Sequence, residues 1–191
     1  MQRLLLLLFL TMAAPHLMAQ VKREPLVKKY SYAAQKKYYP ELINNVFLGM
    51  TWNEFRKAVK TEDLEFERNF AGTSVTFKAH FPVGNNFDNI SSVTYNFPGS
   101  DSTYDAGTMD SNARLYEMAV EFERVEDLNI FLVGWRQIKG PKILSYYDWI
   151  VKTNDGMECR VAAGGFSMTY VGKIPGTPWK EDIELIDAHS K

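Results

Sequence analysis

The chain has 191 residues, of which 46% are hydrophobic and 24% charged; this predicts one folded domain and excludes an intrinsically disordered protein. The formal net charge is −1 at pH 7. Basic residues gather in residues 20–43 and the rest of the chain is acidic, which excludes a nucleic-acid-binding domain, because such a domain is itself basic.

The first residues, MQRLLLLLFLTMAAPHLMAQ, predict a secretory signal peptide over residues 1–19. Arg3 precedes an apolar run that is shorter than the roughly 20 residues needed to span a membrane. We expect cleavage after Ala19, so that the mature protein starts at Gln20 and is exported to the periplasm or out of the cell. An exported chain whose only cysteine is Cys159 forms no internal disulfide bond.

Residues 20–43 are predicted to form a basic N-terminal arm or helix. Pro25 suits the first turn of a helix, and Pro40 would end it. Two interpretations of the lysines in this segment stay open. In the first, they make weak contact with an anionic membrane or cell wall. In the second, they form the solvent-exposed side of a helix that precedes the domain.

The stretch FLGMTWNEFRKAVK predicts the start of a short helix. Thr51 and Glu54 have the spacing of a capping box, in which each side chain accepts a hydrogen bond from the backbone amide of the other. Trp52, Phe55 and Val59 then fall on one helix face. We therefore expect a helix that packs on the rest of the protein through aromatic side chains.

Four segments that follow alternate between apolar and polar residues, as half-buried strands of an antiparallel sheet do. They read DLEFERNF, TSVTFKAHF, SVTYNF and YEMAVEFE. The spacing of Val125, Leu128, Leu132 and Trp135 predicts a second helix. Three more strands, DWIVKT, MECRVAA and FSMTYV, follow, with a hairpin signal at Asp155-Gly156.

These elements predict an α+β fold, in which helices pack on one face of an antiparallel sheet. We expect a single domain over residues 44–180 and a C-terminal tail over residues 181–191. The element order also suits two tandem repeats, each a helix followed by three strands, because SVTYNF resembles SMTYV 75 residues later. A single unit and a duplication both stay open.

The stretch FLGMTWNEF resembles the Gly-Met-Thr helix start of the small outer-membrane assembly lipoproteins. It is also similar to the secreted β-lactamase-inhibitor proteins, whose fold is two α-plus-sheet repeats. The resemblance implies a bacterial envelope protein that binds other proteins through its sheet face and loops, and that catalyses nothing. This chain lacks the lipid-bearing cysteine of the lipoproteins.

The polar side of the predicted strands is the candidate partner-binding site. With helices on the other side, this face is open to solvent. We expect it to carry Thr76, Lys78, His80, Thr94 and Asn96. Aromatic residues in or near loops are further candidate anchors for a partner; they are Tyr32, Tyr38, Tyr39, Tyr104 and Trp179.

No catalytic residue and no cofactor can be assigned from the sequence. A Ser-His-Asp arrangement would need His80, which lies on a polar strand face without a nucleophile motif beside it. Cys159 lies on the apolar side of its strand and is predicted to be buried. Asp101, Asp105 and Asp110 are weak candidates for a Ca²⁺ site, because their spacing fits no standard Ca²⁺-binding loop.

Three functions therefore compete. The first is an exported, non-catalytic module that binds a protein partner in the bacterial envelope. The second is a carrier of a small apolar ligand, held in a cavity between helix and sheet. The third is an envelope hydrolase that depends on His80.

Overall fold

A computed structural model describes residues 29–68, 74–84, 89–100, 102–103, 105–175 and 177. The predicted signal peptide and the C-terminal tail lie outside these residues, as do Asp101, Tyr104 and Trp179. In the described part of the chain, no helix is long and apolar enough to cross a membrane.

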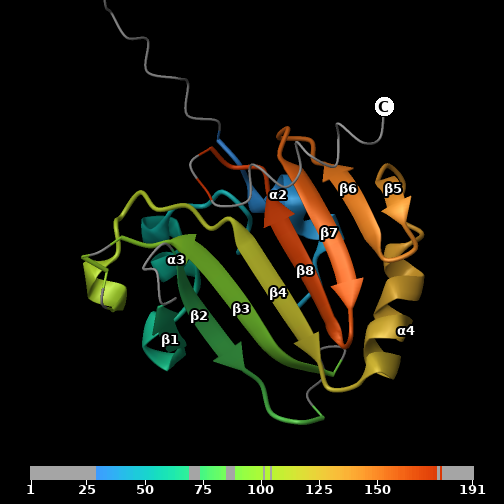
Figure 1. Ribbon diagram of the computed structural model, residues 1–191, viewed down its shortest axis with the longest axis horizontal. Helices are drawn as coiled ribbons and strands as arrows, with labels where there is room; N and C mark the ends of the chain where they lie inside the picture. The colour runs from blue at the N-terminus through green and yellow to red at the C-terminus, as the bar shows by residue number, and fades with distance from the viewer. Residues whose placement is uncertain are drawn as a thin grey trace, which may run out of the picture.

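The described residues form an antiparallel sheet of eight strands in the order β1-β2-β3-β4-β8-β7-β6-β5 (Figure 1). The first half of the chain contains α2 (Tyr32–Gln35), η1 (Lys36–Tyr38), α3 (Trp52–Ala58), η2 (Thr61–Asp63), β1 (Glu65–Arg68), β2 (Ser74–His80), β3 (Ile90–Pro98), η3 (Ala106–Thr108) and β4 (Glu117–Phe122). The second half contains α4 (Val125–Trp135), β5 (Lys142–Ser145), β6 (Asp148–Lys152), β7 (Glu158–Gly164) and β8 (Ser167–Gly172).

The predicted α+β class with an antiparallel sheet is confirmed. The four strands predicted after the first helix are present as β1 to β4, whereas four strands, not the predicted three, follow α4. The missed strand is β5, which has four residues, three of them exposed. Because most side chains of this short edge strand are exposed, its sequence does not alternate between apolar and polar residues. Whether the two halves arose by duplication stays a prediction.

One face of the sheet is apolar and holds the core. Trp52 and Phe55 of α3 are buried against this face, and the Trp52 ring stacks on Phe77 of β2 with a centroid distance of 4.6 Å. The Phe55 ring meets Tyr95 of β3 edge-on at 5.0 Å. These rings are large and tightly packed, so they account for much of the apolar burial in the first half.

The predicted capping box at the start of α3 is confirmed. The Thr51 amide donates to the Glu54 carboxylate at 2.7 Å, and the Glu54 amide donates to the Thr51 hydroxyl at 3.3 Å. Each bond satisfies a backbone donor that the first helical turn leaves unpaired. The sequence therefore specifies where this helix starts, and with it which side carries the aromatic rings.

The second predicted helix, α4, also contacts the apolar face. Phe131 packs on Phe122 of β4 at 5.5 Å, and Trp135 packs on Trp149 of β6 at 4.7 Å. The opposite side of α4 exposes Ile130. In the view of Figure 1 the sheet stands in front of α2 and α3, and α4 lies beside the β5–β6 end of the sheet.

The described part of residues 20–43 packs into this core. Tyr38 and Tyr39 are buried, and the Tyr39 ring meets Tyr170 of β8 edge-on at 5.2 Å. The helical part is short, since α2 and η1 together end at Tyr38. Because their rings are inside, Tyr38 and Tyr39 cannot anchor a partner at the surface, contrary to the expectation from sequence.

Gln35 fastens this segment to the domain. Its side chain is buried; the amide nitrogen donates to the Leu48 carbonyl at 3.1 Å, and its oxygen accepts from the Leu48 amide at 3.0 Å. The Tyr39 hydroxyl donates to the same Gln35 oxygen at 2.5 Å. Asp155, in the hairpin between β6 and β7, accepts from the Ser31 amide at 2.9 Å. The N-terminal segment is thus joined to two distant parts of the chain.

Candidate protein-binding face

The face of the sheet opposite the one that the rings of α3 and α4 contact is polar, and it brings the five predicted site residues together. In the register of β2 and β3, Thr76 lies opposite Asn96 and Lys78 lies opposite Thr94. His80 lies on the same side at the end of β2. Directly opposite residues have Cβ atoms about 4.5–5.5 Å apart, so the five side chains form one continuous patch on two adjacent strands.

Hydrogen bonds hold one row of this patch across three strands. The Thr76 hydroxyl donates to the Asn96 side-chain oxygen at 2.7 Å, and the Asn96 amide nitrogen donates to Glu117 of β4 at 2.8 Å. Burial raises the pKa of Glu117 above its usual value, against the effect of the bond from Asn96. A row that is bonded in this way has its side chains oriented before any partner arrives.

A second row centres on Glu121 of β4. Its carboxylate accepts from the Ser92 hydroxyl at 2.5 Å and pairs with the Lys78 ammonium at 3.0 Å. The bond from Ser92, supported by Lys78, holds the pKa of Glu121 below its usual value. Lys78 therefore does not present a free positive charge to a partner; it presents one half of an ion pair.

Glu117 and Glu121 are functional candidates that sequence reasoning missed. The alternation of YEMAVEFE places both on the polar side, but it cannot show that β4 pairs with β3. That pairing depends on the connection from Pro98 to Glu117, whose described residues include η3 but no strand. The one sequence signal that could have identified Glu117 and Glu121 as site residues is their position on the polar side of the predicted strand.

The polar face continues into the second half of the sheet. β4 pairs with β8, so the eight strands are continuous. On β7 the Arg160 guanidinium binds the Asp148 carboxylate of β6 through two nitrogens, with a shortest distance of 2.6 Å. Bidentate pairs of this kind fix both side chains.

His80 lies at the margin of the patch. Its Nε2 atom is 3.0 Å from the Glu65 carboxylate on β1, and 61% of its side chain is exposed. Exposed pairs of this type contribute little to stability. The position suits a contact at the rim of an interface.

The candidate Ca²⁺ residues are engaged in local turns. Asp105 accepts from the amides of Gly107 and Thr108 at 2.8 and 2.9 Å, and it caps η3. Asp110 accepts from the Asn112 amide at 2.9 Å. Among the described residues, no group of three acidic, histidine or cysteine side chains could hold a metal ion.

Cys159 is buried, as the sequence predicts, and burial raises the pKa of its thiol strongly. The thiolate is the reactive form of cysteine, so this thiol is a packing group. The Tyr39 and Tyr170 rings lie next to it in the core, where burial raises the pKa of both phenols.

A hollow of about 440 Å³ lies between the first half of α4 and the sheet. Leu128 and Tyr147 line it together with the glycines of the β7–β8 turn. This volume falls within the range of small-molecule sites, about 300–1,000 Å³. The large aromatic residues of the core do not line it; Trp52, Phe77 and Tyr95 pack on each other or on Phe55 instead.

Comparisons of the chain with protein-family models, with curated proteins and with solved structures found no match.

Proposed function

We propose that the protein is an exported, non-catalytic module that binds a protein partner in the bacterial envelope through the polar face of its sheet. One observation carries the proposal. The face that the helices leave open is lined by side chains already held by hydrogen bonds, from Thr76 through Asn96 to Glu117. Side chains that are ordered beforehand lose less conformational entropy when a partner binds.

The size of the face suits a protein partner. Eight strands at about 4.8 Å spacing, each about six residues long at about 3.3 Å per residue, span roughly 34 by 20 Å. This gives an area of roughly 700 Å², close to the roughly 800 Å² that each partner contributes to a standard interface. The resemblance of FLGMTWNEF to envelope binding modules points in the same direction.

The chemistry of the face suits specific recognition. Its acids and bases are mostly paired within the face, as Lys78 is with Glu121 and Arg160 is with Asp148. A surface of paired charges exerts little long-range attraction, so selectivity comes from the match of hydrogen bonds and shape at short range. We therefore expect a partner surface with a complementary pattern of donors and acceptors.

The carrier function is kept as a second candidate because of the hollow beside α4. Native mass spectrometry of the gently purified protein separates the two. An added mass of a few hundred daltons that disappears with Leu128→Trp, which fills the hollow, would favour the carrier. A second polypeptide favours the binding module.

The direct test of the binding module uses variants on two sides of the molecule. Thr94→Arg places a large cation in the middle of the polar face, whereas Lys57→Glu changes an exposed side chain on α3. The tagged full-length protein is purified from the cells that produce it, and the co-purifying protein is quantified. We expect Thr94→Arg to lose the partner and Lys57→Glu to retain it, with unchanged melting temperatures. A partner that stays bound to Thr94→Arg would refute the polar face as the binding surface.

A further inference from the structure

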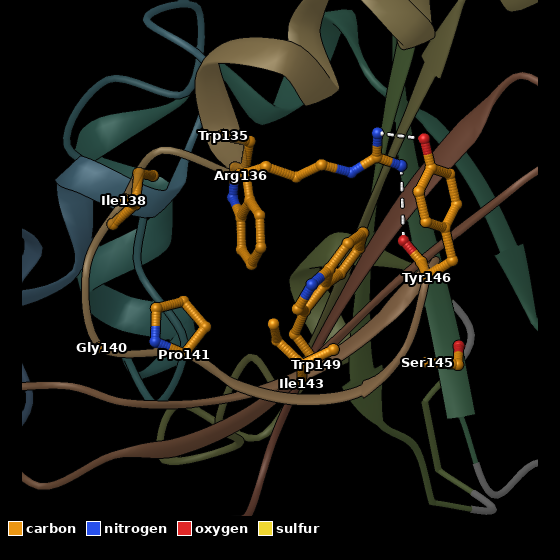
Figure 2. A pocket seen from close by; sticks show the side chains of 9 residues that line it. All are labelled: Trp135, Arg136, Ile138, Gly140, Pro141, Ile143, Ser145, Tyr146 and Trp149. Atoms are coloured by element: carbon orange, nitrogen blue, oxygen red, sulfur yellow. Dashed lines mark hydrogen bonds between the residues drawn. The ribbon is translucent and has the colours of Figure 1, made fainter.

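A pocket of about 210 Å³ lies between the end of α4 and β5 (Figure 2). Part of its wall is formed by Trp135 of α4 and Trp149 of β6, whose buried rings lie 4.7 Å apart at an angle of 50°. The Trp135 indole nitrogen donates to the Tyr38 carbonyl at 3.0 Å, so this polar atom needs no partner in the pocket. Ile138 and Ile143 also line it. The volume is below the roughly 300–1,000 Å³ of drug-sized sites and suits one apolar side group.

The mouth of the pocket carries a positive charge. The Arg136 guanidinium donates to the Tyr146 hydroxyl at 2.9 Å and to the Tyr146 carbonyl at 3.3 Å, and it lies 3.9 Å from the centroid of that ring (Figure 2). Both acceptors are uncharged, so they fix the position of the guanidinium without neutralising it. Within the described residues no acidic side chain pairs with Arg136. Lys139, exposed between the lining residues Ile138 and Gly140, adds a second positive charge nearby.

An apolar interior with a cation at its mouth selects a particular ligand chemistry. Aromatic rings also attract cations, but the positive charges of Arg136 and Lys139 oppose a cationic ligand. The guanidinium has more N–H donors than its two bonds to Tyr146 use, and its planar fork matches a carboxylate. Phosphate-bearing segments are recognised by clusters of arginines, whereas Arg136 is the one arginine among the described residues that line this pocket. The matching ligand is therefore an apolar group next to a carboxylate.

We propose that this pocket is a second binding site, which holds a carboxylate attached to a single apolar side group. The side group lies against the rings of Trp135 and Trp149, and the carboxylate pairs with Arg136. Two kinds of molecule carry this chemistry: the C-terminal residue of a protein chain, and a free small carboxylic acid. The pocket lies on the side of the sheet that α4 contacts, whereas Thr94 lies on the polar side. The site is therefore independent of the polar face.

The test is a titration of the full-length protein with an acetylated peptide of three glycines and a C-terminal leucine. Binding is followed by tryptophan emission, because Trp135 and Trp149 line the pocket. The peptide with a free carboxylate is expected to bind, more weakly at high salt. The same peptide with a C-terminal amide, or with serine in place of leucine, is expected to bind about tenfold more weakly or worse, because each lacks one half of the recognised chemistry.

Two arginine variants locate the bound carboxylate. Arg136→Gln is expected to lower the affinity for the leucine peptide by about tenfold or more. Arg56→Gln is the matched control, because Arg56 is also an exposed arginine but lies on α3; it keeps the affinity of the unchanged protein. Equal affinities of the two variants, equal affinities for the free acid and the amide, or no saturable binding up to about 10 mM peptide would each overturn the proposal.

A second ligand distinguishes the two sources of the carboxylate. N-acetyl-leucine has the same terminal residue without the preceding chain. If it binds as tightly as the peptide, the site is supported as one for a small acid; if the peptide binds more tightly, it is supported as one for a chain terminus. Thr94→Arg is expected to bind the peptide unchanged, and loss of binding in this variant would overturn the proposal, because the peptide would then occupy the polar face. This proposal and the proposed function can thus fail separately.

Discussion

Replacing Gln35 with methionine tests whether the N-terminal segment is a working part of the domain. Methionine has a similar length but lacks the amide that bonds both backbone groups of Leu48, which is fully buried. A buried polar group left without a partner costs about 1–3 kcal/mol. Leu48 has two such groups bonded to Gln35, its amide and its carbonyl. We therefore expect Gln35→Met to lower the free energy of unfolding by about 2–4 kcal/mol.

Urea denaturation, followed by tryptophan fluorescence, measures this change. With an m value of about 2 kcal/mol/M, the midpoint falls by about 1–2 M at constant m. The control is Lys36→Met, which introduces the same residue at the exposed neighbouring position and is expected to change stability by less than about 0.5 kcal/mol. If Gln35→Met is as stable as Lys36→Met, the segment is not docked as described.

Three further predictions concern the cap, the pH dependence and the leader. Thr51→Ala removes the hydroxyl that accepts from the Glu54 amide and should cost about 1 kcal/mol in urea unfolding; a change below about 0.3 kcal/mol would contradict the cap. Glu121 has a lowered pKa in the folded protein, so its stabilising effect is complete above the ordinary pKa of 4.5 and is lost as the pH falls through the pKa of the folded state. Glu121→Gln should therefore be less stable than the unchanged protein at pH 7 and should lose less stability on acidification. Glu117 has a raised pKa in the folded protein, so its ionised form destabilises the fold fully above that pKa, and this destabilisation is relieved as the pH falls towards 4.5. Glu117→Gln should lack this gain in stability on acidification. Equal pH dependence of stability in the Glu117→Gln and Glu121→Gln variants would refute the assignment. N-terminal sequencing of the protein from its producing cells should give Gln20 first, and a retained residue 1 would contradict the signal peptide.

Local signals in the sequence predict much of the fold. The capping box at Thr51, the helix from Val125 and the hairpin at Asp155-Gly156 depend on residues a few positions apart, and the structure contains all three. Alternation also places Thr76 and Asn96 on the same polar side. Such features can be predicted because side-chain spacing alone determines them.

Long-range contacts were not predictable from the sequence. Gln35 looks like a polar residue of a basic helix, and only its contact with Leu48 shows that it is buried. The interactions of Glu117 and Glu121 need the pairing of β3 with β4, and the exposed edge at β5 needs the order of all eight strands. In each case the decisive neighbour is distant in sequence, where periodicity carries no information.

The measurement that tests the central claim most directly is site-specific photocrosslinking from position 94. A photoreactive amino acid replaces Thr94 on the polar face, and in a second protein it replaces Lys57 on α3. Both proteins are irradiated in the cells that produce them. The proposed function predicts one protein adduct of defined mass from position 94 and none from position 57. No adduct from position 94, or the same adducts from both positions, would contradict binding through the polar face.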